Sequence, residues 1–323
     1  MRLLYHVTDS TDPFDNLALE EFLFSRLSGD QVILYLWQNE NTVVIGRNQN
    51  AWRECRLDVF AAQNGRLVRR LTGGGAMYQD MGNQNFTFFA PAALYDVEKQ
   101  TEVIRLAVKS FGIETQRSGR NDILADGRKF SGNAYHAAKE KSFHHGTILI
   151  SSDLGRLSGF LTPSPEKIQS KGVQSVASRV VNLRDLCPEL TPQAIRAALL
   201  RAFAEVYGEE PQPFDRELFD TGEIARLRER YADDDWRIGR LSRFDYNARR
   251  RFSFGELEFD FSVENGRVSK AAVHSDALDA AWVLEMERGL LGAAFTAEAL
   301  AQAIPAGNGR DETAEFFLRE FRG

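Results

Sequence analysis

Three consecutive glycines that follow two arginines give this chain a loop suited to binding an anion. The loop spans residues 69–75 and has the sequence RRLTGGG. Glycine lets the backbone turn sharply and leaves successive N–H groups uncovered, and such groups can hold a phosphate. An ordinary tight turn would use the same residues, and the spacing matches neither a Walker loop nor the dinucleotide fingerprint. The loop alone therefore leaves an anion site and a structural turn as alternatives.

Further blocks of polar and basic residues accompany the loop. They span residues 42–50 (TVVIGRNQN), 118–123 (SGRNDI), 126–135 (DGRKFSGNAY) and 143–149 (FHHGTIL). In this order the blocks resemble the lipoate-protein ligase A family, whose catalytic module belongs to the biotin and lipoate ligase superfamily. The resemblance covers the whole chain, is dense between residues 41 and 149, and is thinner after residue 184.

The resemblance implies an ATP-dependent ligase with an α+β fold. It predicts a class II synthetase-like catalytic domain of mixed sheets and packed helices over residues 1–246, and a small α/β accessory domain over residues 247–323. Such an enzyme of lipoate salvage activates free lipoate to lipoyl-AMP and transfers the lipoyl group to one lysine of a lipoyl domain. The implied acceptors are the E2 subunits of 2-oxoacid dehydrogenases and the H protein of the glycine cleavage system. The implied cofactors are ATP and Mg²⁺.

The resemblance places Lys129, in the block GRKFSG, at the centre of catalysis. An ammonium there could bridge the acyl carbonyl and the α-phosphate, first drawing lipoate and ATP together and later stabilising the departing AMP. A lone lysine is usually a solvated surface residue, so this role depends on the ordered blocks around it. The pocket must also close, because water would otherwise hydrolyse the adenylate before the partner's amine arrives.

The other site residues implied by the resemblance lie around the loop and in the later blocks. The predicted contacts to ATP or lipoyl-AMP, besides Lys129, are Arg70, Thr72, Gly74, Gly75, Ala76, Met77, Tyr78, Asn83, Asp122, Ser131 and His145. Backbone atoms of residues 75–78 should contact the nucleotide, and Asp122 is also the expected Mg²⁺ ligand. Thr72 and Asn83 could instead brace a turn. Asp122 could form an Asx turn, and His145 could be a core histidine with its hydrogen bonds satisfied.

Two positions depart from the family pattern. Gln79 stands where many members carry a histidine before the aspartate that is Asp80 here, so an amide replaces an imidazole. Because of this difference, the family's substrate preference or reaction rate does not transfer directly to this chain. Residues 236–239 (WRIG) lack the proline that commonly follows in members, which concerns only the domain junction.

Other functions could use similar residues. A lipoyl or octanoyl transferase would take a pre-activated acyl group and would have little use for ATP, although its acyl pocket could look nearly the same. The appended second domain favours the ligase, because in the family it accompanies the adenylating forms, though not exclusively. A ligand-binding regulator without turnover is disfavoured by the presence of both the loop and Lys129. A biotin ligase is disfavoured because residues 69–75 differ from that relative's adenylate loop.

The composition is typical of a globular cytoplasmic protein. The 323 residues are 43% hydrophobic, and no apolar run approaches the roughly 18 residues that a membrane span needs. No basic and apolar leader is visible, and two cysteines, Cys55 and Cys187, fit a reducing compartment. The net charge of −6 disfavours a general nucleic-acid binder, although arginines gather near the motif blocks. We therefore expect neither a nucleic acid nor a membrane as a partner.

Short strands and amphipathic helices must position these residues. The patterns predict strands at residues 32–37, 42–45, 66–70, 86–89 and 143–150, with the first two forming a hairpin. Apolar residues at helical spacing from Val97 to Phe111 predict a helix that Gly112 ends. Residues 154–207, interrupted by prolines, should be mainly helical. Alternation over residues 252–261, before the turn signal Asn265-Gly266, predicts a hairpin at the start of the second domain, with helices last.

Overall fold

The computed structural model describes residues 1–56, 60, 62–119, 121–161, 180–238 and 245–321 of the chain. These residues form two compact units. The first unit comprises Met1–Val44, Cys55–Val68 and Met77–Arg237, and the second comprises Ile45–Glu54, Arg69–Ala76 and Ile238–Gly323. Two short segments from the N-terminal half, including the glycine loop, thus group with the C-terminal part. The domain bounds 1–246 and 247–323 stay a prediction.

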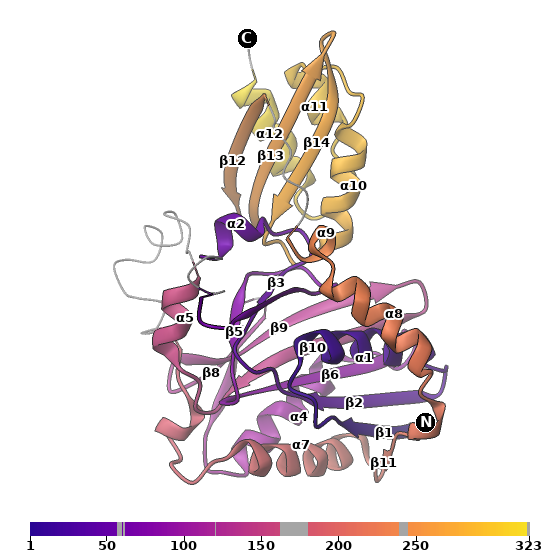
Figure 1. Cartoon of the computed structure of the whole chain (residues 1–323), viewed down its shortest axis with the longest axis vertical. Helices are drawn as coiled ribbons and strands as arrows, with labels where there is room; N and C mark the ends of the chain where they lie inside the picture. The colour runs from indigo at the N-terminus through magenta and orange to yellow at the C-terminus, as the bar shows by residue number, and fades with distance from the viewer. Residues whose placement is uncertain (57–59, 61, 120, 162–179, 239–244, 322–323) are drawn as a thin grey trace. The chain divides into compact units, whose positions relative to one another are not determined.

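A mixed eight-stranded sheet forms the centre of the first unit (Figure 1). In sheet order its strands are β11 (Gln212–Pro213), β1 (Arg2–Val7), β2 (Gln31–Trp37), β6 (Asn83–Pro91), β10 (Lys141–Leu149), β9 (Arg128–Ala138), β8 (Asp122–Ala125) and β7 (Thr115–Ser118). β1 pairs in parallel with β11 and β2, and the remaining pairs are antiparallel. Asp126 and Gly127 join β8 to β9 with positive φ angles of 50° and 69°, as a two-residue hairpin turn requires.

Two helices cover the apolar face of this sheet. They are α4 (Val97–Lys109) and α7 (Pro192–Tyr207), which lie next to each other in Figure 1. The core between helices and sheet includes Leu34, Phe86, Phe88, Ile104 and Leu199. Because strand side chains alternate between faces, these apolar residues leave the other face to different side chains. The spacing from Val97 to Phe111 predicted α4 correctly.

The opposite, more polar face of the sheet lies against α1 (Pro13–Arg26). α1 begins after Asp12, whose side chain caps the helix, and Pro13 occupies the first turn, where it suits a helix start. Asn16 and Glu20 of α1 are fully buried polar residues. A further helix, α8 (Thr221–Ala232), packs on α1, and ion pairs such as Arg228–Asp15 connect the two helices.

A smaller sheet of three strands has the order β4 (Arg66–Arg69), β3 (Thr42–Ile45) and β5 (Met77–Gln79). The predicted hairpin between residues 32–37 and 42–45 is wrong, because β2 pairs with β1 and β6 whereas β3 pairs with β5. The physical reason lies in the link between them. Gln38 donates to the carbonyl of Met81, and Asn39 is likewise buried and bonded elsewhere, so these residues do not close a turn. The remaining short elements of the first unit are α5 (Leu154–Phe160), α9 (Asp234–Arg237), η2 (Leu183–Asp185) and η3 (Arg216–Leu218).

The C-terminal part of the second unit is an antiparallel sheet with three helices. The strands are β12 (Tyr246–Phe252), β13 (Gly255–Glu264) and β14 (Arg267–Ser275), and the helices are α10 (Ala280–Leu290), α11 (Ala297–Gln302) and α12 (Arg310–Glu320). Phe259, Trp282 and Phe317 lie in its core. The second unit also contains α2 (Ala51–Glu54). The mixed sheets, the packed helices and the small C-terminal domain with its hairpin first confirm the predicted fold class.

Three predicted features lie outside the described residues. They are Arg120 of the block SGRNDI, residues 162–179 of the segment expected to be helical, and Gly239 of the domain junction. Of the helices that the structure describes, none combines the length and the apolar character needed to cross a membrane.

Candidate functional site

Lys129 and Asp122, two of the predicted site residues, form an ion pair in the first unit. Lys129 Nζ lies 2.6 Å from Asp122 Oδ1, and the side chains are 33% and 36% exposed. Asp122 begins β8 and Lys129 is the second residue of β9. A pair with this much exposure contributes little to the stability of the fold. Its main effect is to hold an ammonium group at a defined place where a ligand can reach it.

A β-bulge determines which face of the sheet Lys129 occupies. Asp122 is opposite Gly132 and Ile123 is opposite Ser131, but Leu124 is opposite Lys129, so Phe130 is an extra residue in β9. In a regular strand, residues 129 and 132 would point to opposite faces. The extra residue shifts the alternation by one, so both face the same side.

The Lys129 side chain consequently lies over Gly132. A Cβ atom at position 132 would come 2.8 Å from Lys129 Nζ and 2.9 Å from its Cε, closer than nonbonded atoms approach. The absence of a side chain at Gly132 is therefore what leaves room for the lysine. This arrangement gives a physical reason for the spacing of lysine and glycine in the block GRKFSG.

The strand register places a row of polar side chains on the same face. Across the sheet the row runs Trp37, Asn85, Thr147, Gly132 and Asp122. Thr147 joins Gly132 through its hydroxyl, which accepts the Gly132 N–H at 3.5 Å. Directly opposed residues share a face, so Asn85 and Thr147 face the same side as the Lys129 ammonium.

His145 lies in the neighbouring row, opposite Thr87 and Ala134. Its Nδ1 is 2.8 Å from Glu20 Oε1, which also accepts a 2.6 Å hydrogen bond from the Thr87 hydroxyl. That hydroxyl in turn accepts the indole N–H of Trp37 at 3.1 Å. His145 therefore has internal partners, as a core histidine would, and it also lies on the face that carries Lys129. Its predicted place in the lipoyl pocket stays a prediction.

Neither Glu20 nor Thr87 was among the site residues predicted from the sequence. One signal could have revealed Thr87: within the buried strand β6, Asn83, Asn85 and Thr87 recur at every second position among phenylalanines. Such alternation marks one polar face. Glu20 carried no signal of this kind, because a glutamate in an amphipathic helix is usually exposed.

Ser131 is fully buried but points elsewhere. It is opposite Ile123, which belongs to the apolar core, and its hydroxyl accepts from Asn133 Nδ2 at 3.4 Å. Asn133 Oδ1 lies 2.8 Å from Nε2 of His144, a residue of the same side. Burial, with smaller effects of His145 and Arg117, lowers the pKa of His144 to about 3. The structure therefore does not bring the Ser131 hydroxyl to the Lys129 ammonium.

Tyr78 and Met77 of β5 face different surroundings. The Tyr78 side chain is buried, its hydroxyl donates to Asn41 Oδ1 at 3.2 Å, and burial raises its pKa. It lines a hollow of about 570 Å³ together with Arg66 and Arg156. Met77 is half-buried, and its sulfur lies 3.5 Å from Gln79 Nε2. Since neighbouring residues of a strand point to opposite sides, only backbone atoms of residues 77 and 78 could contact one ligand together.

Gln79 and Asn83 belong to a buried network of amides. Gln79 Oε1 accepts from Asn39 Nδ2 at 2.8 Å and from Asn85 Nδ2 at 3.2 Å. Asn83 Nδ2 donates to Asn85 Oδ1 at 2.8 Å. The amide that replaces the expected histidine at position 79 thus joins two strands of different sheets through one oxygen atom.

The remaining predicted site residues belong to the second unit. They are Arg70, Thr72, Gly74, Gly75 and Ala76. Arg70 is buried and braces the loop: Nε donates to Thr72 Oγ1 at 2.9 Å, and Nη2 donates to the carbonyls of Gly73 at 2.8 Å and Gly75 at 2.9 Å. Thr72 therefore accepts a hydrogen bond from the arginine and braces the loop. This agrees with the alternative that Thr72 stabilises a turn.

These bonds set the direction of the loop N–H groups. In a trans peptide the carbonyl and the following N–H point in opposite directions. Because the Gly75 carbonyl faces Arg70, the Ala76 N–H points away from the guanidinium. The Gly74 N–H likewise points away and donates to the Ala277 carbonyl at 3.0 Å. Gly74 has a φ angle of 91°, a conformation that side chains disfavour.

Arg69 ties the glycine loop to the block TVVIGRNQN within the second unit. Its Nη1 donates to the carbonyls of Gly46 at 3.1 Å, Arg47 at 3.0 Å and Gln49 at 2.7 Å. The two arginines of the loop therefore bind backbone oxygens. Arg70 and Lys129 belong to different units, and their convergence on one ligand stays a prediction.

The described residues contain no group of three or more histidine, cysteine, aspartate or glutamate side chains able to hold a metal ion. Mg²⁺ commonly uses one or two carboxylates together with substrate phosphates. Asp122, half-exposed beside Lys129, fits that pattern as a single carboxylate. Its role as the Mg²⁺ ligand stays a prediction.

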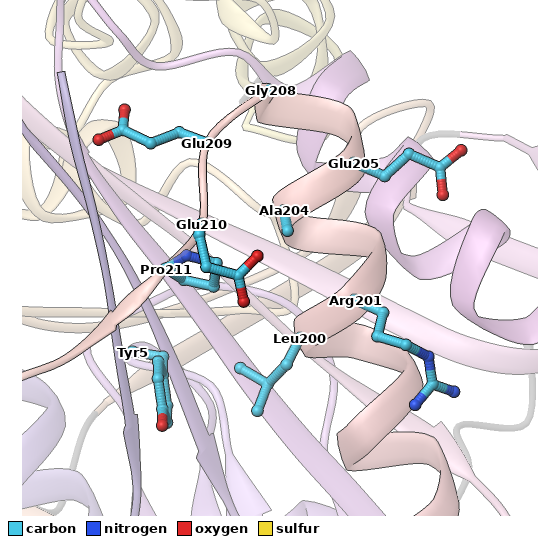
Figure 2. Close-up of a pocket in the computed structure, with 9 residues that line it drawn as sticks. All are labelled: Tyr5, Leu200, Arg201, Ala204, Glu205, Gly208, Glu209, Glu210 and Pro211. Atoms are coloured by element: carbon cyan, nitrogen blue, oxygen red, sulfur yellow. The ribbon is translucent and has the colours of Figure 1, made fainter.

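A separate hollow of about 610 Å³ lies at the C-terminal end of α7 (Figure 2). It is lined by Tyr5, Leu200, Arg201, Ala204, Glu205, Gly208, Glu209, Glu210 and Pro211. The glutamates outnumber the arginine, and the C-terminal end of a helix carries partial negative charge. This hollow is unsuited to phosphate, and none of the predicted site residues lines it.

Both parts of the chain match known family models. Residues 12–204 match the lipoyl protein ligase A/B catalytic domain, and residues 242–321 match the bacterial lipoate protein ligase C-terminus. The chain is 37% identical to lipoate-protein ligase A of Bdellovibrio bacteriovorus over 99% of its own length and 96% of that protein.

Solved structures share the fold. LipL1 of P. falciparum in complex with lipoate is 28% identical, with a TM-score of 0.85 over 98% of this chain and 99% of that one. A lipoate-protein ligase A bound with ATP is 26% identical, with a TM-score of 0.64 over 74% of this chain and 99% of that one. A structure from an archaeal lipoylation system, described as a bipartite lipoate protein ligase and its E2 lipoyl domain from Thermoplasma acidophilum, is 26% identical, with a TM-score of 0.64 over 76% of this chain and 98% of that one.

Proposed function

The chain belongs to the lipoyl protein ligase A/B family and is a lipoate-protein ligase, and we propose that it works through lipoyl-AMP. In this proposal ATP activates free lipoate, and the lipoyl group then passes to a lysine of a lipoyl domain. The single observation that carries the proposal is the Lys129 ammonium, which the β9 bulge and Gly132 hold beside Asp122. A relative bound with ATP and another bound with lipoate support the choice of substrates.

In the first step a lipoate carboxylate oxygen attacks the α-phosphorus of ATP. A bond forms between that oxygen and phosphorus, the bond to the bridging oxygen breaks, and pyrophosphate leaves with the electron pair. Two anions must approach each other, so a cation beside both lowers the barrier. Lys129 is proposed to supply this cation, and Asp122 keeps the ammonium in position until the substrates replace it as the partner.

The glycine loop is proposed to hold the nucleotide through its backbone. Arg70 is occupied by the loop's own oxygens, so its contribution would be to fix the loop and to direct the Ala76 N–H outward. Prearranged N–H groups stabilise phosphate without reorganisation during the reaction. Thr72 would act through Arg70, whereas Gly74, Gly75, Ala76, Met77 and Tyr78 would contribute main-chain atoms.

In the second step the neutral amine of the acceptor lysine attacks the acyl carbon of lipoyl-AMP. An amide bond forms, the bond between the acyl carbon and the phosphate oxygen breaks, and AMP leaves while the nitrogen loses a proton to solvent. Lys129 would stabilise the negative charge on the departing AMP. Mg²⁺, when bound, would shield the triphosphate, and Asp122 is the carboxylate proposed to hold it.

His145 is proposed to line the acyl pocket. Its hydrogen bond to Glu20, together with the bond of Thr87 to the same carboxylate, fixes the imidazole on the face that Lys129 shares. The buried partners would keep the ring in one orientation as the acyl chain packs against it.

The proposed acceptors are lipoyl domains of 2-oxoacid dehydrogenase E2 subunits and the glycine cleavage H protein. The Thermoplasma acidophilum lipoylation system, described as a bipartite lipoate protein ligase and its E2 lipoyl domain, supports the first of these. The chain has only two cysteines, too few for a disulfide framework, which supports a cytoplasmic location, where thiols stay reduced.

Incubation with ATP, Mg²⁺, lipoate and an apo lipoyl domain tests the proposal. Mass spectrometry should show one added lipoyl group on the acceptor, and only when ATP is present. Transfer from a pre-activated acyl donor without ATP, combined with no activity toward free lipoate, would instead identify the transferase alternative. Failure with every E2 domain and H protein tried would contradict the proposed acceptors.

A further inference from the structure

His144 is a fully buried histidine that the proposed chemistry does not use. It lies in β10 opposite Phe88 and Tyr135, on the apolar face of the sheet, whereas Lys129 lies on the other face. The ring centroids of Tyr135, Phe86 and Phe88 are 4.9, 5.5 and 6.0 Å from that of its imidazole. Burial is the main cause that lowers the pKa of His144 to about 3, so the ring is neutral near pH 7 and holds one proton.

Both ring nitrogens of His144 lie next to side-chain amides. Nε2 is 2.8 Å from Oδ1 of Asn133 in β9, and Nδ1 is 3.1 Å from Oε1 of Gln100 in α4. A neutral imidazole donates from one nitrogen and accepts at the other, so it cannot donate to two oxygen atoms. One of the two amides must therefore turn its N–H toward the ring.

Asn133 cannot be the amide that turns. Its Nδ2 donates to the backbone carbonyl of Asn121 at 3.0 Å, and a carbonyl only accepts. The backbone N–H of Asn133 donates to the same carbonyl at 2.9 Å, and Asn121 Nδ2 donates back to the Asn133 carbonyl at 2.9 Å. The side-chain oxygen of Asn133 is thus held toward His144, whose Nε2 must carry the ring proton.

Gln100 is the amide that can turn. Its Nε2 is buried and finds no hydrogen-bond partner in the part of the chain that the structure describes. The two ends of an amide have nearly the same size, and half a turn lets Nε2 donate to His144 Nδ1. The Tyr207 hydroxyl is buried without a partner in that same part of the chain; burial raises its pKa, and the neighbouring Gln100 side chain lowers it. The turned amide gives this hydroxyl an oxygen acceptor, so one rotation satisfies all of these atoms.

Gly146 leaves room for the Asn133 oxygen. Gly146 is opposite Asn133 in the ladder of β10 and β9, and a Cβ atom at position 146 would come 2.8 Å from Asn133 Oδ1. The same atom would come 2.6 Å from the Phe86 ring and 2.7 Å from the carbonyl of Gly132. The block FHHGTIL therefore supplies both the donor to Asn133, from His144, and the space that its amide occupies.

The hydrogen bonds between Asn133 and Asn121 form a clamp next to the ion pair of the proposed site. Asn121 directly precedes Asp122, the first residue of β8, whose carboxylate pairs with Lys129 at 2.6 Å. The register of β8 with β9 runs as far as the pair of Asp122 with Gly132, and the bulge interrupts it on the other side of Ile123. The clamp extends this pairing by one residue, so Asp122 is held between the clamp and the bulge.

We propose that His144 is a positioning residue for adenylate formation: its Nε2–H directs Asn133 onto Asn121, and the resulting clamp fixes Asp122 and the Lys129 ammonium on the opposite face of the sheet. The inference rests on the proposed adenylate-forming function and deepens it. His144 contacts no substrate in this account, because it lies on the face that α4 covers. It acts on the reaction only through the place at which the ammonium is held.

The ring tautomer is the first test. Nitrogen-15 NMR of the full-length protein, labelled at histidine, should show that His144 is neutral at pH 7 and carries its proton on Nε2. Comparison with His144→Gln identifies the signals of this ring. A proton on Nδ1 alone would overturn the inference, because Asn133 would then have no donor at His144.

Two substitutions of His144 separate the donor from the rest of the ring. Glutamine places its amide nitrogen near the position of Nε2, so His144→Gln keeps a donor for Asn133 and should retain most of the rate of lipoate-dependent pyrophosphate exchange. Asparagine reaches only the position of Nδ1, so His144→Asn should lower kcat by about 10- to 100-fold. The KM for ATP should change less than kcat, because a misplaced ammonium acts mainly on the transition state.

A double variant tests whether His144 acts through Asn133. Asn133→Ala removes the clamp and should lower kcat at least as much as His144→Asn does. The double variant should be no slower than Asn133→Ala alone, whereas the effects of two independent structural losses would add. Leu199→Ala, in the core on the same face of the sheet, is the matched control. It should lower the unfolding temperature and keep the wild-type kcat in assays below that temperature.

The kinetic outcomes that would overturn the inference are distinct. If folded His144→Asn and Asn133→Ala both keep the wild-type kcat, the ammonium does not depend on the clamp. If His144→Gln is as slow as His144→Asn, or if the effects add in the double variant, the ring serves packing alone. If the wild type catalyses no lipoate-dependent exchange, the proposed function fails and the inference fails with it, which distinguishes this case from the others. The NMR test decides without the Asn133 variant, even if that variant does not fold.

Discussion

Lys129 Nζ occupies space that a side chain at Gly132 would need, since a Cβ atom there would lie 2.8 Å from it. The relationship depends on the bulge at Phe130, which brings both residues to one face of β9. The position of the Lys129 ammonium thus depends both on the register of β9 and on the absence of a side chain at Gly132.

Gly132→Ala should slow adenylate formation and leave the fold stable. The new methyl group displaces the flexible end of Lys129, which can move at little cost to stability. A displacement of about 1 Å at a reacting group can reduce the rate by about 100-fold. Pyrophosphate exchange and thermal unfolding should be measured together. Gly29→Ala is the matched control, because a Cβ at Gly29 meets nothing within 4 Å. Normal exchange by Gly132→Ala would show that the position of the ammonium is unimportant.

Arg70→Lys should loosen the glycine loop. An ammonium cannot reproduce the planar fork that binds Thr72 Oγ1 and the carbonyls of Gly73 and Gly75. We expect a loss of about 1–3 kcal/mol in unfolding free energy, since buried acceptors lose their donors, and a higher KM for ATP. Urea unfolding and steady-state kinetics measure the two effects. An unchanged KM would mean that the loop does not hold the nucleotide.

Acid should destabilise the protein partly through His144. Burial depresses its pKa to about 3 in the folded state, whereas the unfolded chain titrates near the ordinary value of 6.5. Between these values the unfolded state binds more protons, so the stabilising contribution is complete above about pH 6.5 and is lost as the pH falls toward 3, by about 1.4 kcal/mol per pH unit. Urea unfolding from pH 7 to pH 4 should show this slope.

His144→Gln should reduce that slope by about one proton. His6, whose pKa burial lowers to about 4, should continue to contribute in the variant. A slope equal to that of the wild type would show that His144 is not the group that titrates on unfolding.

The order of the sequence blocks predicted the fold class because it carries the resemblance to the lipoate-protein ligase A family, which implies that fold. The spacing from Val97 to Phe111 was sufficient for α4, and Asn265-Gly266 was sufficient for the C-terminal hairpin, since both signals are local. The hairpin expected between residues 32–37 and 42–45 failed because Gln38 and Asn39 serve long-range hydrogen bonds. Local patterns contain no information about such partners.

Only part of the site was predicted, again because local sequence patterns contain no information about distant partners. Lys129 and Asp122 were identified by their blocks, and the structure pairs them. The bulge at Phe130 left no trace in the sequence, because an extra residue shows only in the register with β8. Residue type cannot tell whether the guanidinium of Arg70 binds a ligand or its own loop, and the hydrogen bonds to the loop became visible only in the structure. Glu20 was missed because its burial depends on how α1 packs on the sheet.

Lys129→Ala should abolish adenylate formation, because the carboxylate of lipoate and the α-phosphate would lose the cation between them. The fold should persist, since the side chain is one-third exposed. Lys109→Ala, at an exposed lysine of α4, is the matched control and should behave like the wild type.

Exchange of labelled pyrophosphate into ATP measures adenylate formation directly and without an acceptor protein. The wild type should catalyse this exchange only when lipoate is present, and Lys129→Ala should show no exchange above background while unfolding at the same temperature. Lipoate-dependent exchange of normal rate in Lys129→Ala, or none in the folded wild type, would contradict the account.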